Sequence, residues 1–66
     1  MTAQAQDRLD FILWGIRTSG KSRFGLKNML ERVQPSDYPK FLGKLRKNNI
    51  AYRLNPLDMY CEFTKA

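Results

Sequence analysis

The chain has 66 residues with one cysteine and no histidine, and its 12 Lys and Arg residues outnumber 6 Asp and Glu to give a net charge of +6. This composition excludes an internal disulfide and a zinc cluster, so a hydrophobic core has to stabilise a single small domain spanning residues 1–66. No apolar run approaches the roughly 20 residues of a membrane span. Asp7 and Asp10 precede the apolar run "FILW", where a signal peptide would carry basic residues, so we expect a cytoplasmic protein. We also expect no metal, no cofactor and no membrane contact.

The first predicted element is a helix over residues 5–18. Its apolar residues follow the i, i+3, i+4, i+7 spacing of one buried stripe: Leu9, Ile12, Leu13 and Ile16. Arg17 near the end complements the helix dipole. The small polar residues around Gly20 then predict the end of the helix.

Two shorter helices are predicted next, over residues 25–33 and 36–49. The first repeats the stripe with Leu26, Met29, Leu30 and Val33, and the second with Tyr38, Phe41, Leu42 and Leu45. Pro35 separates them, because the residue before a proline avoids the helical region. Ser36 or Asp37 is expected to cap the third helix. Three helices with matching stripes predict a compact bundle.

The last predicted element is a β-hairpin over residues 50–63. From Ile50 the apolar residues follow the two-residue period of a strand, which places Ile50, Tyr52 and Leu54 on one face. After the turn "NPLD" the same period places Met59, Cys61 and Phe63 on one face of a second strand. The predicted fold class is therefore α+β, a compact three-helix bundle with a C-terminal β-hairpin and an ordered core over about residues 5–63. Cys61 is expected to be a small buried hydrophobe.

The third predicted helix carries the strongest functional signal. On a helical wheel with the stripe facing inward, Lys40, Gly43 and Lys47 point away from the core, with Ser36 in line before them. Residues 40–53 contain five bases and no acid: Lys40, Lys44, Arg46, Lys47 and Arg53. A focused positive charge on a helix suits the major groove and phosphates of double-stranded DNA. The alternative is that these lysines only keep a small domain soluble.

The order helix, helix, turn, helix, hairpin resembles the winged helix-turn-helix superfamily. In this comparison "GLKNMLERV" is the positioning helix, "SDYPKFLGKLRKNN" the recognition helix, "IAYRLNPLDMYCEF" the wing, and "KSRF" a short strand that pairs with the wing. The resemblance implies major-groove or phosphate contacts from Lys40, Lys44 and Lys47, and backbone contacts from Arg53. It implies a small DNA-binding regulator of transcription or replication. Because one domain with a net charge of +6 covers only a short DNA site, we expect it to bind as a homodimer or in tandem.

A second function remains open beside DNA binding. Many winged helices are protein-interaction modules, and Trp14, Tyr52 and Tyr60 could form such a surface on a phage- or plasmid-type modulator of a host factor. The wing tip "NPLD" carries an acid and no base, which argues against a minor-groove arginine there. Single-stranded nucleic acid is a third partner, disfavoured because the outer face of the third helix has no aromatic residue for stacking.

One enzymatic motif is present, "GIRTSGKS" at residues 15–22, which matches the phosphate-loop pattern GxxxxGK[ST]. A phosphate loop needs a parallel sheet and an acidic residue at the end of a second strand, and the sequence predicts neither. We therefore expect no nucleotide binding and no enzymatic activity. Lys21 and Arg23 are expected to contact the DNA backbone beside the recognition helix.

Overall fold

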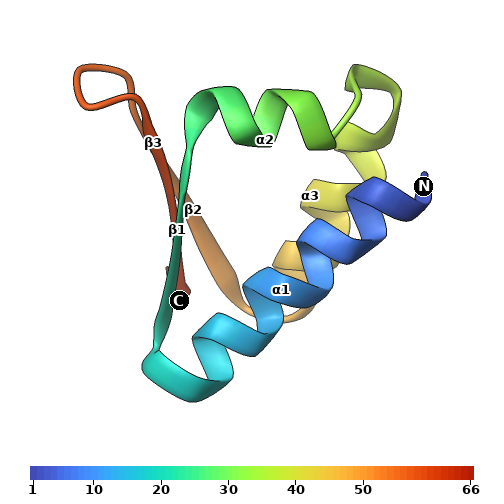
Figure 1. The fold of residues 1–66 in the computed structure, drawn as a ribbon. Helices are drawn as coiled ribbons and strands as arrows, with labels where there is room; N and C mark the ends of the chain where they lie inside the picture. Colours follow the sequence, from blue (N-terminus) through green and yellow to red (C-terminus); the bar gives the residue numbers. More distant parts are fainter.

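The chain forms three α-helices and three strands, as the computed structural model of residues 1–66 shows (Figure 1). In chain order they are α1 (Ala3–Ser19), β1 (Lys21–Gly25), α2 (Leu26–Arg32), the 3₁₀ turn η1 (Pro35–Asp37), α3 (Tyr38–Lys47), β2 (Ile50–Asn55) and β3 (Tyr60–Lys65). The α+β class is thus confirmed. The elements run from residue 3 to residue 65 and so extend beyond the predicted core of 5–63 at both ends.

The strands form one antiparallel sheet in the order β1-β3-β2, with β3 in the centre. β1 pairs with β3 so that Phe24 faces Cys61, and β2 pairs with β3 so that Tyr52 faces Phe63. The short strand expected for "KSRF" is therefore confirmed, including its pairing with the hairpin. Directly opposed residues share a face of the sheet, so Phe24, Tyr52 and the pair Cys61 and Phe63 all lie on the face that packs against the helices.

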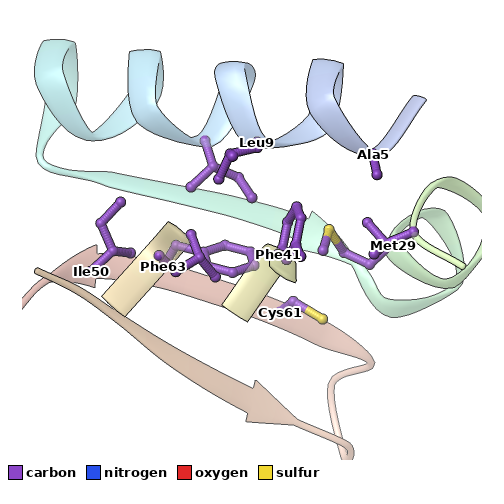
Figure 2. Packing of buried hydrophobic residues seen from close by; sticks show 10 residues of the cluster. Ala5, Leu9, Met29, Phe41, Ile50, Cys61 and Phe63 are labelled. Carbon is purple, nitrogen blue, oxygen red and sulfur yellow. The ribbon is translucent and has the colours of Figure 1, made fainter. Parts of the chain in front are cut away.

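The hydrophobic core lies between α1, α3 and this inner face of the sheet (Figure 2). Its ten buried residues are Ala5, Leu9, Ile12, Met29, Val33, Phe41, Leu45, Ile50, Cys61 and Phe63. Every predicted element contributes to it, and Cys61 is buried as expected, with a free thiol. At about 25 cal/mol per Å² of apolar surface removed from water, this single cluster is the main stabilising term of the domain.

Several residues assigned to the core by periodicity are exposed instead. Leu30 is 57% exposed and Leu42 38%, because α2 and α3 are short and each buries only a narrow stripe. Met59 lies in the hairpin loop rather than in a strand, with a positive φ of 56°. Tyr52 and Leu54 are on the inner face but half-exposed, since β2 is an edge strand of the sheet.

The junction between α1 and β1 depends on two glycines. Gly20 ends α1 with a φ of 82°, a left-handed conformation that favours glycine, and its N–H donates to the carbonyl of Ile16. Gly15 is buried where the strand crosses the helix, and a Cβ there would lie 2.1 Å from the Ser22 Oγ. That hydroxyl donates to the carbonyl of Ile12 at 2.9 Å, which fastens β1 to α1.

The start of α3 is organised differently from the expected side-chain cap. Asp37 makes no hydrogen bond to the α3 backbone, and Ser36 is exposed in η1. The Asp37 carboxylate instead accepts hydrogen bonds from the backbone N–H and the hydroxyl of Thr2, at 3.2 and 3.0 Å. The Thr2 hydroxyl also caps α1 by accepting from the N–H of Ala5. This link orders the N-terminus, which lies outside the ordered core of about residues 5–63 that the sequence predicted.

The Thr2–Asp37 link predicts a pH-dependent stability. The backbone hydrogen bond from Thr2 is the main cause that lowers the pKa of Asp37 below its ordinary 3.8, with Lys40 contributing. A lowered folded-state pKa adds stability above pH 3.8 that is lost as the pH falls through the folded-state value. Asp37→Asn is therefore expected to lower the urea midpoint at about pH 7, with the difference shrinking towards about pH 2. A difference that stays constant with pH would contradict this account.

Candidate nucleic-acid interface

The outer face of α3 presents the predicted recognition residues to solvent. The helix forms because Phe41 and Leu45 are buried against α1 and the sheet, which turns the opposite side outward. All four predicted bases of this helix are exposed: Lys40, Lys44, Arg46 and Lys47. A Cβ added to Gly43 would meet no atom within 4 Å, so this face is open to a close partner. The helical wheel predicted that the bases of α3 are exposed around Gly43, and their exposure is confirmed.

No negative charge interrupts this surface along the chain. Residues 38–57 contain no Asp or Glu, and none of the α3 bases forms an ion pair. Lys40 lies close enough to Asp37 to help lower the pKa of that carboxyl, so part of its charge is offset. Lys44, Arg46 and Lys47 occupy the last turn of α3, where the negative end of the helix dipole stabilises cations.

The remaining predicted bases lie on the outer face of the sheet. Lys21, Arg23 and Arg53 are exposed and alternate with inner-face residues of β1 and β2. Arg23 and Arg53 both face Glu62 of the central strand, and the Arg23 Nε lies 4.0 Å from the Glu62 Oε2. The Arg23 guanidinium also lies over the Tyr60 ring at 4.4 Å. Arg23 is therefore already engaged by an acid and an aromatic ring.

The predicted site residues thus form two groups rather than one. α3 packs beside β2, whereas β1 is at the opposite edge of the sheet, two strand spacings or about 10 Å away. Arg53 is on β2, nearest to α3, although its side chain leaves from the outer face of the sheet. Lys21 and Arg23 therefore lie apart from the α3 bases, and their contact with the DNA backbone stays a prediction.

Arg8, Phe11 and Phe24 were not singled out by the sequence, although Trp14 beside them was named as part of a possible protein-interaction surface. The Arg8 guanidinium stacks over the Phe24 ring at 4.3 Å and donates from its Nη2 to the Asn28 Oδ1. Burial, and to a smaller extent the charge of Arg32, lowers the pKa of Arg8. Phe11 lies against both Phe24 and the half-exposed Trp14, with ring centroids 5.5 and 5.7 Å apart. The periodicity of α1 did not predict this aromatic cluster, because Phe11 and Trp14 lie outside the buried stripe of the helix.

Tyr52 links the edge strand to the core through its hydroxyl. The Tyr52 Oη lies 3.7 Å from the Cys61 Sγ, and its ring lies 5.2 Å from that of Phe63. Burial of the hydroxyl, with the adjacent Cys61 thiol, raises the pKa of Tyr52 to about 12. The phenol is therefore neutral at physiological pH and belongs to the packing of the sheet rather than to an acid–base pair.

The phosphate-loop match falls on structural positions. Gly15 lies inside α1, Gly20 ends that helix, and Lys21 and Ser22 open an antiparallel strand. A phosphate loop runs from a strand into a helix N-terminus, where free N–H groups surround the phosphate. Here the motif runs from a helix C-terminus into a strand. The Ser22 hydroxyl that would contact the metal ion is buried and bonded to the Ile12 carbonyl.

Comparisons with known proteins supply no relative: no protein-family model, curated protein or solved structure matches the chain.

No cluster of His, Cys, Asp and Glu side chains is arranged to hold a metal ion. None of the helices combines the length and the apolar character needed to cross a bilayer. Among the surfaces described, the basic face of α3 has the most clearly defined complementary partner, a polyanion.

Proposed function

We propose that the protein binds double-stranded DNA as a winged helix-turn-helix regulator of transcription or replication. α3 enters the major groove, with α2 as the positioning helix and the β2–β3 hairpin as the wing. The observation that carries this proposal is the outer face of α3, where Lys40, Lys44 and Lys47 surround the open position of Gly43 without an acid or an ion pair. An α-helix fits the width of the major groove, and its lysines neutralise phosphates and release condensed counterions.

The arrangement of the sheet supports the same proposal. The order β1-β3-β2 places the hairpin next to α3, and the N–H of Leu26 donates to the carbonyl of Met59 at 2.7 Å, which anchors the hairpin loop to the start of α2 (Figure 1). This bond holds the loop of the proposed wing against the start of α2. Arg53 is the base it offers to the DNA backbone.

Selection of bound sequences from random duplex DNA tests the proposal. At about 0.1 M salt, we expect enrichment of a short sequence and an affinity that falls steeply as salt is raised. Unchanged pools after repeated selection, together with affinity indifferent to salt, would contradict duplex recognition. A comparison with single-stranded DNA of the same sequence separates groove binding from attraction to any polyanion.

Gly43 offers a test in which stability and DNA affinity move in opposite directions. Gly43→Ala is expected to stabilise α3 by up to about 1 kcal/mol, because alanine is the better helix former and the site is open. The added methyl would separate the helix from the groove, and we expect about tenfold weaker DNA binding. Thermal denaturation and a DNA-binding titration measure the two effects.

Gly25→Ala is the matched control for this substitution. Its Cβ would also meet no atom within 4 Å, but Gly25 lies at the start of α2, away from the outer face of α3. DNA affinity should therefore remain close to that of the wild type. If Gly43→Ala binds DNA as tightly as the wild type, close approach of the α3 backbone is not part of recognition.

A protein partner is the second candidate, favoured by the hairpin loop. Leu57 is 93% exposed and Met59 is half-exposed, and the only charge between them is that of Asp58. An apolar, acidic tip suits a protein surface better than a phosphate backbone. Recovery of one stoichiometric protein on the immobilised chain, lost in Leu57→Ser, with weak DNA binding indifferent to sequence, would favour this function over the first.

A further inference from the structure

An open cleft of about 460 Å³ lies at the end of the molecule away from the hairpin loop. It is formed where α1 ends, where α3 passes into β2, and where β3 finishes. Six residues line it: Leu13, Ile16, Arg17, Asn48, Ile50 and Lys65. Its volume falls within the range of about 300–1,000 Å³ that is usual for small-molecule sites.

The sequence brings apolar and cationic groups together here for simple geometric reasons. Leu13, Ile16 and Arg17 are spaced i, i+3 and i+4, so they share one face of α1. Ile50 and Lys65 are directly opposed on β2 and β3, which places both on the inner face of the sheet. The lining therefore combines three aliphatic side chains with two cations, Arg17 and Lys65.

The charge of the cleft is not compensated by the protein. No carboxylate lines it, and neither Arg17 nor Lys65 forms an ion pair. Asn48 adds a carboxamide at the end of α3, where its Nδ2 donates to the carbonyl of Lys44 and leaves its Oδ1 without a protein donor. Three aliphatic side chains with two unpaired cations are complementary to a molecule that has an apolar body and one anionic end.

We propose that this cleft binds a small amphipathic organic carboxylate. The carboxylate accepts hydrogen bonds from Arg17 and Lys65, and the aliphatic body covers Leu13, Ile16 and Ile50. A bound molecule contacts α1, the end of α3 and the hairpin at once. The site is separate from the outer face of α3, and its occupancy does not depend on DNA binding.

Octanoate, kept below its micellar concentration, is the probe. We expect saturable one-to-one binding by titration calorimetry, with amide shift changes in nuclear magnetic resonance spectra centred on Arg17, Ile50 and Lys65. Octanol lacks the anion and acetate lacks the aliphatic body, so each should bind at least about tenfold more weakly. The melting temperature should rise with octanoate, because a ligand of the folded state stabilises it.

Two double variants separate the cleft from general attraction to a basic protein. Arg17→Gln with Lys65→Gln should weaken octanoate binding about tenfold or more. Lys27→Gln with Arg46→Gln removes the same charge from α2 and α3 and should leave octanoate affinity unchanged. The proposal is overturned if octanoate binding does not saturate or if octanol binds as tightly as octanoate. It is also overturned if both double variants weaken octanoate binding equally, or if the amide shift changes centre on Phe11 and Trp14.

Discussion

Replacing Lys40, Lys44 and Lys47 together with glutamate is expected to abolish specific binding to duplex DNA while the protein stays folded. All three side chains are exposed and none forms an ion pair, so the substitutions leave no buried group without a hydrogen bond, and the folded state loses only the attraction between Lys40 and the Asp37 carboxylate. Charge-assisted hydrogen bonds at about 1.5 kcal/mol each sum to about 4.5 kcal/mol, or roughly a thousandfold in affinity. The slope of log affinity against log salt should also fall by about 2.7 for three lost phosphate contacts.

A control with the same change of charge distinguishes contact from general attraction. Arg17, Lys27 and Lys65 are exposed on α1, α2 and β3, and their replacement by glutamate should cost far less affinity than the α3 variant. Glutamate near the end of α3 opposes the helix dipole at about 0.3–1 kcal/mol per residue. The corresponding glutamine variant avoids this cost and should still bind weakly. Equal losses in both charge-reversal sets would show that α3 has no special role.

Gly15→Ala is expected to be the most destabilising small substitution in the chain. Its Cβ would lie 2.1 Å from the Ser22 Oγ and 3.3 Å from the Lys21 carbonyl oxygen, so β1 has to move away from α1. Overpacking of about 1–3 kcal/mol and a lost hydrogen bond of about 1 kcal/mol outweigh the roughly 1 kcal/mol gained in helix propensity. A net loss of about 2 kcal/mol corresponds to a melting temperature lower by about 8–16 °C.

Ser22→Ala tests whether the clash occurs at that hydroxyl. Alone, it should cost about 1 kcal/mol, because it removes the bond to the Ile12 carbonyl. In the Gly15→Ala background it should restore stability instead, since the nearest remaining atoms would be 3.3 Å from the new Cβ. The two effects are therefore expected to be non-additive. Additive losses in chemical denaturation would mean that Gly15 matters for another reason.

The periodicity of the sequence predicted the three helices and the hairpin, because each has to bury one stripe or one face. Met29, Phe41, Ile50 and Phe63 all lie in the core as expected. Periodicity failed at Leu30 and Leu42, since it marks which side of a helix is apolar but not how much of that side a neighbour covers. The Thr2–Asp37 link was missed for a related reason: the two residues are 35 positions apart and share no local pattern.

The candidate site was predicted in part. The exposure of Lys40, Lys44 and Lys47 follows from the stripe of α3, so the helical wheel was sufficient. Lys21 and Arg23 lie apart from them, because the strand order that places β1 at the far edge is set by tertiary pairing, and their contact with the DNA backbone stays a prediction. The phosphate-loop match also gains a structural reason, since Gly15 and Ser22 are required by the close crossing of α1 and β1.

The position of bound DNA on the protein tests the central claim most directly. In a titration of the isotope-labelled protein with duplex DNA, followed by nuclear magnetic resonance, we expect the largest amide and side-chain changes at Lys40, Gly43, Lys44 and Lys47, with smaller ones at Arg53. Changes centred on Phe11 and Trp14, or spread evenly over all exposed bases, would contradict the assignment of α3 as the recognition helix.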